Sequence, residues 1–310
     1  MNLRTKKLTA LKTYLSEKVK IPPYLKLLFK ALVSGIAIYI AFSKINIEEA
    51  TSVILHSNIY WLLLAFLLFN LSQWISAFRL KALLEELEIY ASHWYHIRLF
   101  YFGMLYNIIL PGGVGGDAYK VFLLKDRFNK KGRSIFSAIF LDRLCGLVAL
   151  FFLAMILAVI LDLPFEFNFN YILIGAVIIA YPAYYIFYKY LFKTFKQIYI
   201  KVNFLAILMQ GTQIVCAYCI LLALGADSYF LTYLMIFLLS AIATIIPITL
   251  GGLGMREIVF VYAAKFLVFD EETAIALSLI FFLITTLSSL MGIFVNMKAK
   301  PQPEVVINEA

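Results

Sequence analysis

Eight charged side chains stand inside segments that are otherwise apolar. Lys30 and Lys265 lie near expected helix ends, and the other six are the residues best placed to do chemistry. Each charge at the centre of a membrane helix costs about 2.5–3.5 kcal/mol on insertion scales, so such residues are expected to be paired or functional. Helix N-termini are expected after Gly116 and Gly254. Cations beside such N-termini form a suitable site for a phosphate group. The six residues are Asp117, Lys120, Asp142, Arg143, Arg256 and Glu257.

The same residues can instead neutralise one another. Asp117 and Lys120 are three positions apart and would share a helical face. The other two acids each adjoin an arginine in sequence; such neighbours point in different directions and need partners elsewhere. Mutual pairing therefore stands as the alternative to a phosphate pocket formed by Lys120, Arg143 and Arg256.

A short sequence motif beside several of these charges occurs twice in the chain. Each copy has a proline, two variable residues, a branched apolar residue and a Gly-Gly pair, and a cation follows nine positions after the proline. Such helix-breaking residues in corresponding places of two halves indicate the binding site of a transporter. The fixed residues are Pro111, Gly115 and Gly116 in the first copy and Pro247, Gly251 and Gly252 in the second.

The composition indicates a protein that is embedded in a lipid bilayer. The chain is 63% hydrophobic and 15% charged, and its mean hydropathy is +0.90. Most apolar runs reach the ~20 residues that a membrane helix needs, and without strict alternation they do not fit a barrel. We expect an all-α, polytopic transmembrane bundle. The apolar runs lie near 27–43, 59–78, 134–161, 171–188, 203–224, 229–248 and 273–297.

The distribution of cations predicts the orientation. Most of the 27 Lys and Arg residues fall in five segments, which the positive-inside rule places in the cytoplasm together with both termini. The expected cytoplasmic segments are 1–26, 79–98, 125–133, 189–201 and 298–310. The acid-rich segments, expected outside, are 44–58, 162–170, 225–228 and 270–272. The expected location is the plasma (inner) membrane.

This orientation forces two hairpins. Residues 99–124 must enter and leave on the cytoplasmic side, with arms too short to span. Residues 229–269 enter and leave on the outer side in the same way. The chain then forms two repeats of inverted topology, 27–161 and 171–297, joined by the external linker 162–170, and a site is expected where the hairpin tips meet.

One alternative for the second hairpin stays open. Residues 229–246 are long enough to span fully, and 250–268 would then span back.

The sequence shows no catalytic motif. Neither copy of the glycine motif is a nucleotide-binding loop, and no Ser-His-Asp set, zinc motif or kinase signature is visible. Cys216 and Cys219 fit packing, and His93 and His96 fit an interfacial aromatic belt better than a metal site. We expect no cofactor, no metal and no enzyme activity.

Three ordered segments resemble the transmembrane region of the lysylphosphatidylglycerol synthase family, the flippase-like membrane proteins. The likeness runs from about residue 25 to 298 and includes Phe78 to Lys81. It implies movement or presentation of a lipid headgroup, and it matches all six charged residues to polar motif positions. The segments are Leu110–Lys120, Leu141–Gly146 and Ile246–Glu257.

Several details depart from that family. Relatives often have Arg where Lys120 stands and Glu where Asp142 stands, and a basic residue where this chain has Phe281-Phe282. Lys and Arg bind phosphate differently, so bidentate contacts at these points are not implied. The chain ends at Ala310, and we expect no soluble aminoacyl-transferring domain.

The leading hypothesis is a flippase-like protein that binds an anionic phospholipid or a polyprenyl-phosphate-linked lipid and moves or presents it between leaflets. Without a nucleotide-hydrolysing motif, transport would be passive or coupled to an ion or proton gradient. The alternatives are a membrane-embedded lipid-modifying transferase or its partner subunit, with Asp142 or Glu257 as the activating acid, and a non-catalytic scaffold for a glycosyltransferase. No nucleic-acid partner is expected.

Overall fold

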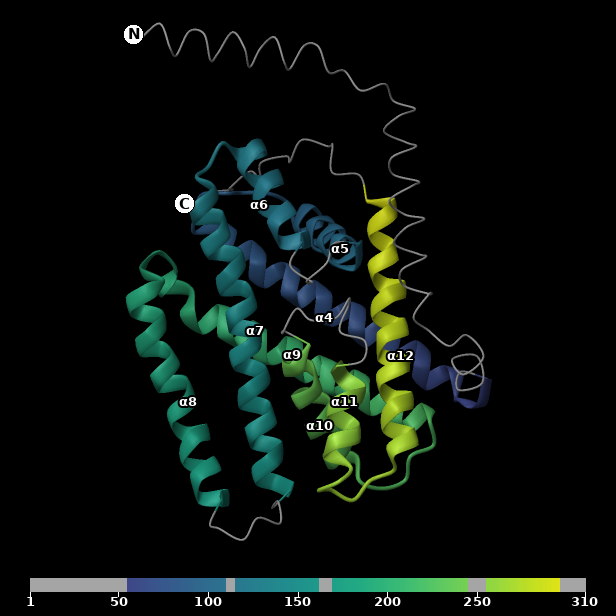
Figure 1. The fold of residues 1–310 in the computed structure, drawn as a ribbon. Helices are drawn as coiled ribbons and strands as arrows, with labels where there is room; N and C mark the ends of the chain where they lie inside the picture. The colour runs from purple at the N-terminus through teal and green to yellow at the C-terminus, as the bar shows by residue number, and fades with distance from the viewer. Residues whose placement is uncertain (1–54, 110–114, 162–168, 245–254, 296–310) are drawn as a thin grey trace, which may run out of the picture.

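The computed structural model describes residues 55–109, 115–161, 169–244 and 255–295, and these residues form helices and turns without any strand (Figure 1). The predicted all-helical class is confirmed. In chain order the helices are α4 (Ile59–Glu85), α5 (His93–Ile109), α6 (Gly115–Phe128), α7 (Gly132–Leu161), α8 (Phe169–Leu191), η1 (Lys193–Ile198), α9 (Tyr199–Ala223), α10 (Phe230–Ala243), α11 (Met255–Ala263), α12 (Glu271–Leu290) and η2 (Met291–Phe294).

Five helical segments among the described residues are long and apolar enough to cross a membrane. A helix rises about 1.5 Å per residue, so each can cover roughly 30 Å of hydrocarbon. The chain is therefore a multi-pass membrane protein. The segments are Ile59–Glu85, Gly132–Leu161, Asn170–Leu191, Lys193–Ala223 and Glu271–Phe294.

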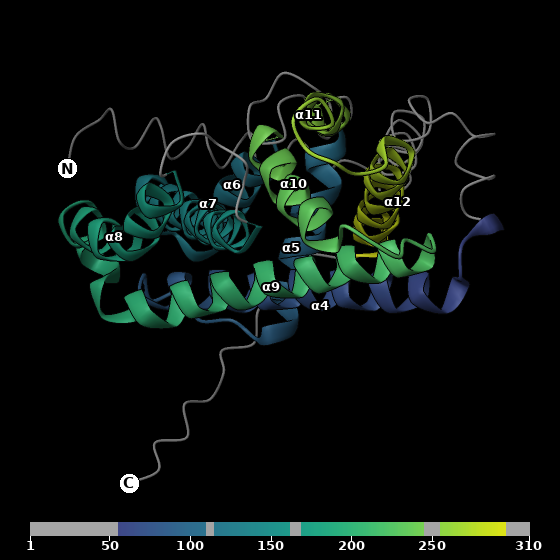
Figure 2. The ribbon, with the colours of Figure 1, turned by 90° about the horizontal axis from the view of Figure 1, so that it is seen from below.

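Helices α4 and α9 form a long antiparallel pair that underlies the bundle. Figure 2 shows them side by side along their whole length, with α7, α8, α10, α11 and α12 on one side of them. Helices α7 and α12 each contact both members of the pair. The spans α7 and α12 therefore pack against both helices of this pair.

Hydrogen bonds join helix ends near some of the segments that the sequence places outside. The Asn58 amide donates to the carbonyl of Ala223 over 2.9 Å, which joins the start of α4 to the end of α9. The Asp270 amide donates to the Tyr233 hydroxyl over 2.9 Å, which joins the start of α12 to the first turn of α10.

Two of the expected cytoplasmic segments also meet. Lys130 Nζ lies 2.6 Å from a Glu88 carboxylate oxygen, and the Arg127 guanidinium lies over the Tyr95 ring at 5.2 Å. The ammonium group of Lys130 lowers the pKa of Glu88 below its usual range. The first hairpin thus begins and ends beside the same part of the molecule, as its predicted turn requires.

Both predicted hairpins consist of paired short helices. Helices α5 and α6 have 17 and 14 residues and pack together. Helices α10 and α11 have 14 and nine residues and also pack together. The three arms α6, α10 and α11 are shorter than the ~20 residues of a full span. Their depth in the membrane stays a prediction.

One helix is longer than the hydrophobic pattern indicates. The apolar run ends at 78, yet α4 continues to Glu85 and includes Arg79 and Lys81. Both side chains are buried, Arg79 with 3% of its surface exposed. Arg79 belongs to a segment expected on the cytoplasmic side, yet it is buried, because Asp142 on α7 neutralises it inside the bundle.

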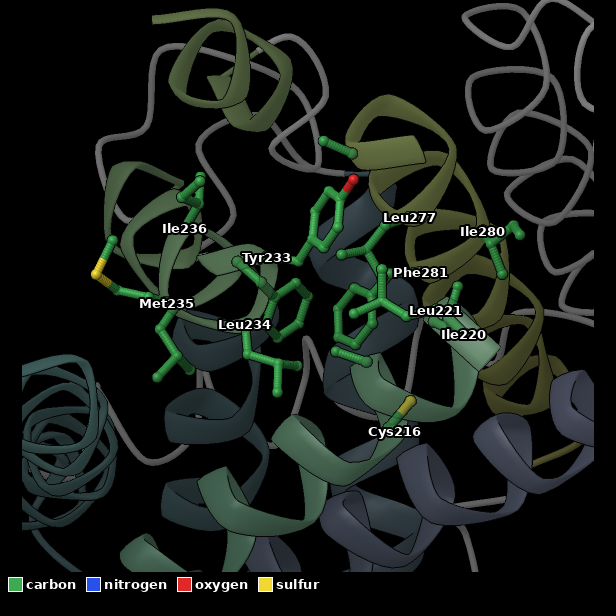
Figure 3. Close-up of a cluster of buried hydrophobic side chains, with 14 of the residues drawn as sticks. Cys216, Ile220, Leu221, Tyr233, Leu234, Met235, Ile236, Leu277, Ile280 and Phe281 are labelled. Atoms are coloured by element: carbon green, nitrogen blue, oxygen red, sulfur yellow. The ribbon is translucent and has the colours of Figure 1, made fainter. Parts of the chain in front are cut away.

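Two apolar cores lie in the bundle. One packs α10 and α12 against the C-terminal half of α9, and Figure 3 shows Tyr233, Leu277 and Phe281 within it. The other packs the end of α4 against α7, α8 and the start of α9. The second hairpin rests on the first core, whereas the first arm of the first hairpin contacts the other core through Tyr95 and Leu99.

Topology is testable with single cysteines placed in a variant in which Cys145, Cys216 and Cys219 are replaced by Ser. Cysteines at Lys130 and Lys196 should be protected from an impermeant thiol reagent added to intact cells, and one at Glu271 should be labelled. Permeabilised cells provide the control, because all three sites should then react. Labelling of Lys130 and Glu271 from the same side would contradict the inverted repeat.

Candidate functional site

The two arms of the first hairpin approach each other at glycines. A Cβ atom built on Gly116, near the start of α6, would collide with the backbone carbonyl of Gly103 on α5. The Gly116 amide donates to the side-chain oxygen of Asn107 over 2.8 Å. Asn107 thus satisfies one of the N–H groups that a helix leaves unpaired at its start.

Asp117 is the centre of the charge cluster on α6. Its carboxylate accepts from Lys120 Nζ at 3.1 Å, as the three-residue spacing predicts, and from Arg143 Nε on α7. Asp117 and Lys120 are buried, whereas the Arg143 side chain is 46% exposed. The Lys120 ammonium lies 4.5 Å from the centre of the Phe100 ring, and its stem fills the place that a side chain on Gly103 would take.

Asp142 has a different partner from its neighbour Arg143. Arg79 Nε donates to an Asp142 oxygen over 2.7 Å, with both side chains buried. The α7 backbone directs Asp142 toward α4 and Arg143 toward α6. Two adjacent residues therefore tie three helices together.

The second hairpin holds its cation on aromatic rings. The Arg256 guanidinium, on α11, lies 5.0 Å from the ring centre of Phe237 on α10 and 4.9 Å from that of Phe281 on α12. Arg256 Nη1 also lies 3.4 Å from the Ser240 hydroxyl. Cation–π contacts of this kind contribute about 0.5–2 kcal/mol each, depending on how far the cation is desolvated.

The two hairpins repeat this arrangement in three dimensions. In each, the cation nine residues after the proline lies over a phenylalanine of the first arm. A small residue three positions beyond that phenylalanine, Gly103 or Ser240, contacts the same cation. The sequence repeat is therefore also a repeat of side-chain contacts.

The structure unites four of the predicted site residues. Asp117, Lys120 and Arg143 form one ion cluster, and Asp142 adjoins it through the α7 backbone. Gly115 and Gly116 begin α6 beside that cluster. Arg256 stands apart on α11, and Glu257 lies in the same helix with its side chain outside the described residues. Outside them too are Pro111, Pro247, Gly251 and Gly252.

Ion pairs at this cluster join three cations to two acids among the described residues. Arg79 pairs with Asp142, and Lys120 and Arg143 share the carboxylate of Asp117. Arg143 is the cation of this cluster that the surroundings reach most easily. Such a cluster can attract one anionic group without losing its internal pairs.

Sequence reasoning missed the residues that support these charges. Asn107, Phe100, Gly103, Phe237 and Ser240 are ordinary residues of apolar runs until the hairpins are folded. The missed signal was their matched spacing: Phe and a small residue three positions apart precede both prolines. Arg79 was noted in the Phe78 to Lys81 likeness but was not included among the site residues.

The family model of the lysylphosphatidylglycerol synthase TM region matches residues 27–292 of the chain. Comparisons with curated proteins and with solved structures gave no match. The matched segment includes both hairpins and every charged residue of the candidate site.

The tight glycine crossing predicts that Gly116→Ala disrupts the first hairpin, because the new methyl group has no space against the Gly103 carbonyl. Folded yield after detergent extraction should fall and the Tm should drop by several degrees. Gly175→Ala on α8 is the matched control, since a Cβ there meets nothing within 4 Å. Equal yield and Tm for the two variants would contradict the crossing.

The buried Arg79 and Asp142 pair predicts a rescue. Asp142→Asn leaves Arg79 buried and uncompensated, at a cost of about 3–5 kcal/mol. Adding Arg79→Gln should recover much of that loss in thermal unfolding. Glu88→Gln, at an exposed ion pair, serves as the control and should change stability little. Failure of the second substitution to restore any stability would show that the two residues do not act as a pair.

Proposed function

Because this chain belongs to the family of the lysylphosphatidylglycerol synthase TM region, we propose that it binds the phosphate-bearing headgroup of a membrane lipid and moves or presents that lipid between leaflets. The lipid is an anionic phospholipid or a polyprenyl-phosphate-linked lipid. Both classes offer a phosphate group on an apolar tail, which suits a cationic cluster inside a membrane bundle.

The observation that carries this proposal is the half-exposed guanidinium of Arg143 beside the buried carboxylate of Asp117. Arg143 presents a planar set of N–H donors that suits phosphate geometry. Asp117, which also binds Lys120, orients it from within the protein. A headgroup phosphate would contact the exposed part of this guanidinium while the tails stay in lipid.

Arg256 supplies a second cation in the other repeat. The rings of Phe237 and Phe281 and the Ser240 hydroxyl hold its guanidinium in place. Both hairpins pack on α7, and α12 contacts α5 and α11. We propose that the hairpins shift against these two spans as the headgroup passes from one side to the other.

The proposal includes no chemical step and no nucleotide-driven step. The sequence holds no nucleotide-hydrolysing motif, so movement would follow the lipid gradient or an ion or proton gradient. A lipid-modifying or glycosyl-transferring enzyme is the partner class that would supply or consume such a lipid.

Native mass spectrometry of the gently purified protein tests headgroup binding, with added phosphatidylglycerol, polyprenyl phosphate and phosphatidylcholine as probes. Arg143→Gln and Arg256→Gln should each weaken binding of one of the two anionic lipids by about 10- to 100-fold, the worth of a charge-assisted hydrogen bond. Arg143→Gln should still fold, because Lys120 continues to neutralise Asp117. Lys265→Gln, at an exposed cation over the Tyr262 ring, is the control and should bind normally.

One outcome would count against this function, and another would decide between its two forms. Folded Arg143→Gln and Arg256→Gln proteins that bind both anionic lipids as well as the wild type would remove the proposed headgroup site. Binding without any acceleration of leaflet exchange in reconstituted vesicles would leave presentation, rather than movement, as the activity.

A further inference from the structure

A buried polar seam lies between α4, α7 and α9, away from the two hairpin cations. Arg79 on α4 and Gln210 on α9 have 3% and 5% of their surfaces exposed. Gly146 on α7 lies next to both, and it is four residues beyond Asp142 on the same helix. The headgroup proposal uses none of the free polar atoms of this seam.

Two atoms of the seam have unmet hydrogen-bonding capacity among the described residues. Arg79 Nη1 is a donor and Gln210 Oε1 is an acceptor, and both are buried without a hydrogen-bond partner there. Proteins pair the great majority of their buried polar atoms, because an unpaired one loses its hydration without compensation. A complementary donor and acceptor in one place indicate a ligand that can both accept and donate.

The two side chains meet at the Gly146 backbone. Gln210 Nε2 donates to the Gly146 carbonyl over 3.0 Å, which fixes the orientation of the amide. A Cβ atom on Gly146 would stand 3.6 Å from both Arg79 Nη1 and Nη2, at ordinary contact distance. The missing side chain of Gly146 thus leaves space about the size of one methyl group beside the guanidinium.

We propose that this place binds one internal water molecule. The water oxygen accepts from Arg79 Nη1, and a water hydrogen is donated to Gln210 Oε1, which gives it two of the two to four partners that buried waters have. An anion does not suit the site, because Asp142 already neutralises Arg79 and the Gln210 oxygen would repel it. Met209 Cε also stands 3.6 Å from the Cβ position of Gly146, so the space beside the guanidinium suits a ligand the size of water. The water holds Arg79 in the orientation in which it binds Asp142.

Substitutions at Gly146 test the site through a pair of variants of similar size. Gly146→Ser places a hydroxyl group where the water stands and should keep the wild-type Tm within about 2 °C. Gly146→Ala displaces the water without replacing its hydrogen bonds and should lower the Tm by about 2–10 °C. Gly175→Ser and Gly175→Ala on α8 correct for helix propensity, since that position is open.

A high-resolution density map of the wild-type protein gives a readout that needs no variant. The site predicts a single water peak within hydrogen-bond distance of Arg79 Nη1 and Gln210 Oε1. After correction, a Tm for Gly146→Ala equal to or above that of Gly146→Ser would overturn the proposal. So would a density map in which a protein side chain occupies the place beside Gly146.

Discussion

Helix α7 organises the charges of this protein because its neighbouring residues Asp142 and Arg143 point toward different helices. Asp142 neutralises Arg79 within the bundle, and Arg143 reaches Asp117 on the first hairpin. Buried charges stabilise a fold only when they are paired, and here the pairs also set the position of α4 and α6 relative to α7. Arg143 is 46% exposed while it binds Asp117, so the contact that ties α7 to α6 also leaves a guanidinium at the surface of the bundle.

The second hairpin also holds a cation between helices, but with different side chains. Its cation, Arg256, lies over the rings of Phe237 and Phe281, whereas Lys120 in the first hairpin combines one ring with a carboxylate. Aromatic faces attract a cation without neutralising it. The two repeats therefore share a geometry but hold their cations with different partners.

The sequence predicted what depends on chain-local patterns and missed what depends on packing. The length of the apolar runs predicted the five membrane-spanning helices of the described residues. The placement of cations predicted that 79–98 and 125–133 lie on one side, and the Asp117 to Lys120 spacing predicted their ion pair. The partner of Asp142 was not predictable from the apolar run, because Arg79 lies beyond its end and is buried only when α7 covers it. Phe100 and Phe237 look like lipid-facing residues until the arms pair. The side of the membrane that each end faces follows from charge alone and is still a prediction.

The central claim is that the Arg143 cluster and Arg256 hold a lipid phosphate. A high-resolution structure of the protein in nanodiscs that contain phosphatidylglycerol or a polyprenyl phosphate tests it most directly. We predict density of phosphate size within hydrogen-bond distance of Arg143 or Arg256, with an acyl or isoprenyl tail that leads out to the bilayer. A structure in which both arginines contact only protein groups, and no lipid lies near either hairpin, would contradict it.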